Sequence, residues 1–194
     1  MSVTINLPQR VKTGKATFLR DGEYKDIEKR ISRISDPEAG CVFYYAFDPL
    51  TRVGPFVGPD LRMPNCGIRT VGAAAYQAGF KNTRVVFGPW NPNFDARYME
   101  LNNSIPQIFG IGSMQIHEAD AHEKIEQANA LGTNRPLIIG GGPHANYQGW
   151  DYFNKDPKKS IDVAVRGEIN VTLSLLETIL EFKSQKESML DGYK

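Results

Sequence analysis

The sequence predicts an α/β protein built on a doubly wound, five-stranded parallel sheet. Three observations support this fold class. Short apolar segments, typical of strands buried on both faces, occur at residues 41–47, 83–87, 108–112, 137–139 and 161–165. Segments with helical spacing of apolar residues separate several of them, and glycine or proline follows most of the strands. Strands that alternate with helices imply right-handed crossovers and hence a parallel sheet.

The expected helices are identified by the spacing of their apolar residues and by their stop signals. A helix of small residues at 68–78 and an amphipathic helix at 118–131 each end at a glycine. A weak helix is expected at 96–101. The last helix begins near Asn170 and gives way to a polar tail, while the segment between the glycine run and the fifth strand is expected to be a loop.

The chain of 194 residues divides into a main domain and two flanking parts. These parts are an N-terminal extension at 1–39, the α/β domain at 40–183, and a C-terminal tail or start of a linker at 184–194. In the extension, Asp21-Gly22 lies between alternating segments at 15–20 and 23–27, which predicts a β-hairpin. A helical turn is expected to follow it.

Composition and charge narrow the class of protein. The chain carries 23 lysine and arginine residues against 22 aspartate and glutamate residues, a net charge of +1, with both signs spread throughout. No basic face therefore argues for nucleic acid or an anionic membrane. No apolar run approaches about 18 residues, and the N-terminus lacks the apolar segment of a signal peptide. The two cysteines, Cys41 and Cys66, have no metal or redox spacing, so we expect a cytoplasmic protein.

The strongest functional signal is the segment at residues 136–145, which reads PLIIGGGPHA. Three glycines follow an apolar strand, and glycine leaves space where another molecule approaches the backbone. Loops after four of the strands should meet at the carboxyl edge of the sheet, where parallel sheets bind ligands. A binding site is therefore expected there, although a plain strand-to-helix turn also explains the glycines. The candidate residues are Ser113, Met114, Gln115, Gly140, Gly141, Gly142, His144, Gly167 and Glu168.

Nucleotide and metal motifs do not account for this segment. No lysine followed by serine or threonine closes the glycine run, which excludes a Walker loop, and the Gly-Ile-Gly at 110–112 lacks the third glycine of the dinucleotide fingerprint. His144 could contact a ligand or donate to a backbone carbonyl, and both interpretations stay open. His117 and His122 are five residues apart and so lie on different faces of a helix, which predicts a solvated face and no metal site.

Two segments at a characteristic separation point to a family. They are IIGGGPHA at 138–145 and DVAVRGEINVTLSLLETIL at 162–180, with a looser match in the helix at 67–79. Over residues 41–180 the chain resembles the cobalamin-binding domain that precedes the catalytic barrel in cobalamin-dependent radical SAM enzymes. The resemblance implies a flavodoxin-like, Rossmann-type fold. It also implies that the corrin ring lies across the carboxyl edge and that the nucleotide tail threads between the strands.

The resemblance assigns roles to the candidate residues. Ser113 matches the serine that such domains place near the tail, and the two residues after it lie beside it. The glycines at 140–142 match those that leave room for the tail. Gly167 and Glu168 match the final loop of the family. No residue receives a catalytic role.

One departure from related cobalamin proteins concerns the cobalt ligand. Cobalamin mutases and methionine-synthase-like proteins carry Asp-x-His-x-x-Gly after the first strand, and that histidine ligates cobalt. Here residues 48–54 read DPLTRVG, so Leu50 stands at the ligand position. We therefore expect cobalamin to be held without a protein histidine beneath the cobalt, a state common among radical SAM methylases that favours methyl transfer.

The chain lacks the remaining parts of a radical SAM enzyme. The iron–sulfur cluster needs three thiolates in Cys-x-x-x-Cys-x-x-Cys, and the two cysteines here lie 25 positions apart. We expect a module that is not catalytic alone. A catalytic domain in cis or in trans would then hold the 4Fe-4S cluster and S-adenosylmethionine for methyl transfer or related radical chemistry. The alternatives are a stand-alone flavodoxin-like binder of a nucleotide or flavin, and a small enzyme that uses His144 and Glu168 as acid and base.

Overall fold

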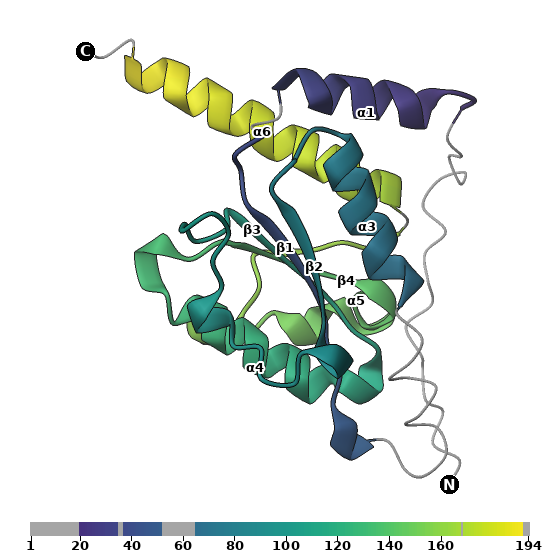
Figure 1. Ribbon diagram of the computed structural model, residues 1–194, viewed down its shortest axis with the longest axis vertical. Helices are drawn as coiled ribbons and strands as arrows, with labels where there is room; N and C mark the ends of the chain where they lie inside the picture. Colours follow the sequence, from purple (N-terminus) through teal and green to yellow (C-terminus); the bar gives the residue numbers. More distant parts are fainter. Residues whose placement is uncertain (1–19, 35–36, 52–64, 168, 192–194) are drawn as a thin grey trace, which may run out of the picture.

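The computed structural model describes residues 20–34, 37–51, 65–167 and 169–191. All strand pairs of its central sheet are parallel, in the order β2-β1-β3-β4-β5 (Figure 1). The strands are β1 (Cys41–Tyr45), β2 (Thr83–Phe87), β3 (Ile108–Gly112), β4 (Leu137–Gly141) and β5 (Val163–Ala164). The predicted α/β fold with a five-stranded parallel sheet, flavodoxin-like and Rossmann-type, is confirmed.

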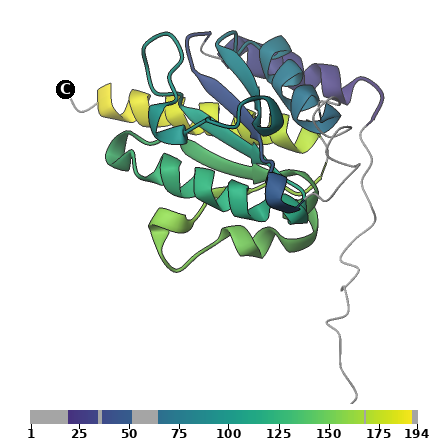
Figure 2. The same ribbon diagram turned by 60° about the horizontal axis from the view of Figure 1, so that its bottom comes forward.

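Helices cover both faces of the sheet, as a doubly wound fold requires. The helices are α1 (Glu23–Ile34), α3 (Cys66–Gln77), α4 (Glu118–Asn129), α5 (Gly142–Gln148) and α6 (Ile169–Asp191). Helices α1, α3 and α6 pack together over one face, around a core that includes Phe43 and Ile139. Helices α4 and α5 and the 3₁₀ turn η7 (Gly149–Tyr152) lie on the opposite face, around Phe109 and Ile138, as Figure 2 shows. Within the described residues, every helix is too short or too polar to span a bilayer.

Helix α3 approaches the sheet closely because its buried face is made of small residues. A Cβ added at Gly72 would collide with the Cγ2 atom of Val85 on β2. Ala74 and Ala75 of the same helix are buried. At the N-terminus of α3, the Oδ1 atom of Asn65 accepts a hydrogen bond of 3.2 Å from the backbone N–H of Ile68, which is an N-cap. The predicted small-residue helix is therefore confirmed.

The predicted β-hairpin at residues 15–27 is wrong in its described half, because the chain forms α1 from Glu23 onward. Its first strand, up to residue 19, lies outside the described residues. The Glu23 carboxylate accepts a hydrogen bond of 2.8 Å from the backbone N–H of Arg20 and so caps the first turn. Ile27 and Ile31, four residues apart, are buried in the core formed with α6. The helical spacing of these two residues outweighs the local turn signal.

Other predicted boundaries differ from the structure in ways that follow from packing. The weak helix expected at 96–101 is the short 3₁₀ helix η4 (Ala96–Tyr98). The fifth strand is only two residues long, and β5 pairs with β4 through Val163 and Ala164 at one edge of the sheet. The segment expected to be a loop contains α5 and η7. Helix α6 continues through Asp191, beyond the start of the expected polar tail, because that part of the sequence is rich in good helix formers.

Candidate functional site

Glycines on the neighbouring strands β3 and β4 reduce the number of side chains on one face of the sheet near its carboxyl edge. Strands β1, β3 and β4 end in register, with Tyr45, Gly112 and Gly141 side by side. Two residues earlier on β1 and β3, Phe43 pairs with Gly110. Because strand residues two apart point to the same face, Gly110 and Gly112 remove both side chains from that face of β3.

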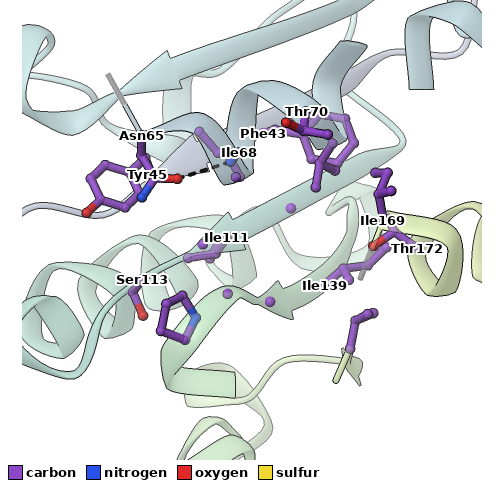
Figure 3. A pocket seen from close by; sticks show the side chains of 18 of the residues that line it. Phe43, Tyr45, Asn65, Ile68, Thr70, Ile111, Ser113, Ile139, Ile169 and Thr172 are labelled. Atoms are coloured by element: carbon purple, nitrogen blue, oxygen red, sulfur yellow. Dashed lines mark hydrogen bonds between the residues drawn. The ribbon is translucent and has the colours of Figure 1, made fainter. Parts of the chain in front are cut away.

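A cavity of about 250 Å³ lies at this edge, between the sheet and helices α3 and α6 (Figure 3). It adjoins β1 and β3, where the strand order reverses and where open parallel sheets bind their ligands. Most of its wall is apolar, from Phe43, Ile68, Val71, Ile139, Val165 and Ile169. The polar side chains along the wall are Asn65, Thr70, Ser113 and Thr172. The predicted site edge therefore contains a cavity suited to a flat, largely apolar group.

The three glycines of the run have different surroundings. A Cβ at Gly141 would meet no atom within 4 Å, so this glycine leaves open space beside the cavity. Gly140 points to the opposite face, where a Cβ would lie 2.8 Å from Cδ1 of Ile161. Gly142 has a φ of +83°, and a Cβ there would lie 3.3 Å from the backbone N and O atoms of Ser113. Gly140 and Gly142 are therefore required by the packing of the chain itself.

Ser113 follows β3, lines the cavity and is fully buried. Its hydroxyl forms a short hydrogen bond with the hydroxyl of Tyr152, which comes from η7. Burial raises the pKa of Tyr152 to about 12, so its hydroxyl stays protonated at neutral pH. The carbonyl of Ser113 accepts the backbone N–H of His144 at 3.0 Å. Ser113 thus ties the end of β3 to α5 and η7.

The remaining candidates lie at the rim or beyond the described residues. Met114 and Gln115 do not line the cavity, and the exposed Gln115 donates a hydrogen bond of 2.6 Å to the side chain of Gln148. Gly167 does line it and has a φ of +128°, a conformation that favours glycine. Glu168 lies outside the described residues, and with it the predicted acid–base pair with His144.

His144 is fully buried on α5 and faces α4 and η7 instead of the cavity. Its Nε2 atom lies 3.7 Å from Oδ2 of Asp151, and its Nδ1 atom lies 4.0 Å from Oε2 of Glu118. Among the described residues, neither ring nitrogen has a hydrogen-bond partner, so the bond to a backbone carbonyl, one of the two interpretations of His144, is absent. Burial lowers the pKa of His144 despite the two carboxylates, so the ring is neutral at pH 7.

The other two histidines diverge, as their spacing predicts. His117 is buried against Phe47, with ring centroids 4.8 Å apart, and its Nδ1 atom accepts the backbone N–H of Asp48 at 3.1 Å. His122 lies on α4 beside Tyr152, with ring centroids 5.7 Å apart. The expectation of a solvated face is therefore wrong for His117, which helps to anchor the loop after β1.

Sequence reasoning missed most of the cavity wall. Apart from Ile111, the strand residues of the wall alternate along their strands: Phe43 with Tyr45, Gly110 with Gly112, and Ile139 with Gly141. That alternation was present in the sequence. The helix residues of the wall carry no such local signal, because their positions depend on how α3 and α6 cross the sheet.

A comparison of the chain with protein-family profiles, curated proteins and solved structures finds no significant match.

Proposed function

We propose that this chain binds cobalamin, with the nucleotide tail in the cavity and the corrin ring over the carboxyl edge of the sheet. The observation that carries the proposal is the cavity at the reversal of strand order, with open space beside Gly141. Sites that enclose a whole drug-sized ligand have volumes of about 300–1,000 Å³. At about 250 Å³ the cavity suits the flat base at the end of a larger molecule, whose remainder must stay outside.

The chemistry of the wall fits such a base. Ile68, Ile139 and Val165 offer apolar contact to the two faces of a ring system. Thr172 is a nearly buried polar residue of the wall, and Asn65 is a second polar group near the mouth. These side chains can contact ring nitrogens or sugar hydroxyls without the charged groups that a phosphate-binding loop would need.

The segment after β1, at the same edge of the sheet, offers an apolar side chain to a ligand. Leu50, in the 3₁₀ helix η1 (Pro49–Thr51) after β1, is 90% exposed. This is the position at which related cobalamin proteins carry the cobalt-ligating histidine, and leucine cannot ligate a metal. A macrocycle over this edge would remove the leucine from water, which is favourable by about 25 cal/mol per Å² of apolar surface.

The reaction itself would take place in a separate catalytic domain. Cobalamin, when bound, supplies cobalt-based methyl transfer, and a radical SAM catalytic domain in cis or in trans would supply the iron–sulfur cluster and S-adenosylmethionine. This chain would hold the cofactor, orient its ring and keep water from its tail. We place the chain among cobalamin-binding modules of that class, with methyl transfer or a related radical reaction as the activity of the complete enzyme.

Equilibrium dialysis against hydroxocobalamin tests this proposal, with corrin absorbance as the readout. The Gly141→Leu variant should fold, since its Cβ points into open space and its φ of −144° is extended backbone, but its side chain should fill the cavity. We expect about one corrin per wild-type chain and at least a 10-fold weaker affinity for the variant. The control Ala73→Leu adds leucine at an exposed position of α3 and should bind as the wild type does.

Two outcomes would overturn the proposal. One is that the wild-type chain takes up no hydroxocobalamin but binds flavin mononucleotide in a parallel dialysis, which favours the flavodoxin-like alternative. The other is that Gly141→Leu and wild type bind cobalamin equally well, which means that the cavity is not the site.

A further inference from the structure

We infer that Glu118, His144 and Asp151 form a binding site for a divalent transition-metal ion. One potential ligand atom from each, a ring nitrogen or a carboxylate oxygen, lies within 4.8 Å of the other two. The three residues come from the start of α4, from α5 and from η7. Helices α4 and α5 and the turn η7 pack on one face of the sheet, whereas α3 and α6, which bound the cavity, pack on the other (Figures 1 and 2). The site is therefore distinct from the proposed cobalamin site.

The lone pair of a neutral His144 ring faces carboxylate oxygens, and a bound cation would give that lone pair a suitable partner. A neutral imidazole has one N–H donor and one acceptor nitrogen, whereas an ionised carboxylate only accepts. With Glu118 facing Nδ1 and Asp151 facing Nε2, either tautomer leaves a nitrogen lone pair directed at a carboxylate oxygen. Both nitrogens are buried and without a hydrogen-bond partner among the described residues. A metal ion bound at one nitrogen would remove the repulsion there, and the other nitrogen would then carry the N–H and donate it to the carboxylate that faces it.

The distances permit closure on a metal by small side-chain movements. Zinc binds nitrogen and oxygen ligands at about 2.0–2.2 Å, which places tetrahedral ligand atoms about 3.4 Å apart. The separation of 3.7 Å between Nε2 of His144 and Oδ2 of Asp151 is close to this value, and one ligand atom from each of the three residues lies within 4.8 Å of the other two. The His144 side chain is fully buried and fixed, while those of Glu118 and Asp151 are 53% and 37% exposed and so have room to rotate. The ring is thus preorganised, and the two carboxylates adjust.

The ligand set indicates which ions would bind. Imidazole nitrogen suits zinc, cobalt, nickel and iron, whereas magnesium and calcium prefer oxygen ligands alone. Three protein ligands leave at least one coordination position for water. Glu118 and Asp151 also line a groove with Glu123 and Glu126, and the lysine of this groove, Lys159, pairs with Glu126 at 2.8 Å and leaves the two proposed ligands free of it. We therefore expect a Zn²⁺-type site that is open to the groove.

Titration of the metal-free chain with Zn²⁺, and with Co²⁺ as a spectroscopic probe, tests the inference without cobalamin. The wild type should bind one ion, with a thermal midpoint that rises with Zn²⁺ concentration. Asp151→Asn is isosteric and partly exposed, so it should fold normally and bind at least about 10-fold more weakly. His144→Ala should lose the Co²⁺ absorption bands that a nitrogen ligand produces.

His122→Ala is the matched control, because His122 lines the same groove but does not belong to the three ligands. It should bind Zn²⁺ as the wild type does. The inference is overturned if His122→Ala abolishes binding while Asp151→Asn retains it, or if Mg²⁺ binds as tightly as Zn²⁺. It is also overturned if the wild type binds neither Zn²⁺ nor Co²⁺. Because cobalamin is absent from these titrations, none of these results bears on the proposed function.

Discussion

Alanine should have opposite effects on stability at Gly110 and at Gly141. A Cβ at Gly110 would lie 2.5 Å from Cδ1 and 2.9 Å from Cε1 of Phe43, which is far inside van der Waals contact. Phe43 is buried at 2% exposure and pairs directly with Gly110, so the added methyl group would force its ring out of its packed position toward the cavity that it lines. At Gly141 the added Cβ would meet nothing within 4 Å, and alanine readily adopts the extended backbone there.

The expected changes in the free energy of unfolding differ in sign between the two variants, and both are large enough to measure. Overpacking a filled core costs about 1–3 kcal/mol, which is our expectation for Gly110→Ala. A glycine-to-alanine change without strain stabilises by about 0.4–1 kcal/mol, because it reduces the freedom of the unfolded chain. For a chain of this size, each kcal/mol shifts the thermal midpoint by about 2–4 °C. The two variants should therefore lie on opposite sides of the wild type.

Urea unfolding followed by far-ultraviolet circular dichroism measures both free energies on the same scale. The slope of the unfolding free energy against urea concentration should be unchanged in both variants, since neither alters the surface that unfolding exposes. A Gly110→Ala variant as stable as the wild type would refute the reasoning. In that case the Phe43 ring would not occupy the space that the missing side chain leaves.

Three further substitutions test other parts of the fold. Burial alone would raise the pKa of Asp162, but hydrogen bonds from Arg135 at 2.6 and 2.7 Å and from a backbone N–H hold it below its usual range. The ionised Asp162 carboxylate therefore adds to the free energy of unfolding above about pH 4, and this contribution is lost as the pH falls through the lowered pKa. In Asp162→Asn the free energy of unfolding should depend less on pH in this acid range. Ile31→Ala, at a fully buried site of α1, should cost about 2–5 kcal/mol in urea unfolding. Tyr152→Phe should cost about 1–3 kcal/mol, because it leaves the buried hydroxyl of Ser113 without its partner.

Each of these substitutions has a control or a contradicting result. Arg33→Ala, at an exposed position of the same helix, should change the unfolding free energy by less than about 0.5 kcal/mol. An equally small effect of Ile31→Ala would show that α1 is not part of the cooperative fold. Tyr147 is 73% exposed, so Tyr147→Phe should be neutral, and the same neutrality at Tyr152 would contradict the buried hydrogen bond. An unchanged acid limb in Asp162→Asn would contradict the lowered pKa.

The sheet was predictable because its strands are marked by local sequence. β2 and β3 have the bounds that their apolar runs predict, and the alternation of strands and helices fixed the parallel arrangement. The start of α1 was not predictable, since its stability depends on contacts with α6. Arg30, for example, pairs with Glu177, 147 positions away in the sequence. The Asp-Gly signal at residues 21–22 is local and carried no information about that contact.

Sequence patterns predict which edge of the sheet holds the site, but not which residues form its wall. The glycine run marks the carboxyl end of β4, but the sequence does not say which face each glycine points to. Gly141 leaves space at the cavity, whereas Gly140, one residue earlier, is covered by Ile161. The neighbours of His144 were equally hidden, because Glu118 and Asp151 reach it from elements on either side in the sequence. Such groupings depend on the crossing of elements, which single-sequence patterns do not encode.

The measurement that tests the central claim most directly is the amount of corrin that wild-type and Gly141→Leu protein bind at equilibrium. Circular dichroism should first show that the two proteins are equally folded. The account predicts saturation near one corrin per wild-type chain and a strong loss of affinity in the variant, whose added side chain occupies the cavity. Equal uptake by the two proteins, or none by the wild type, would contradict it.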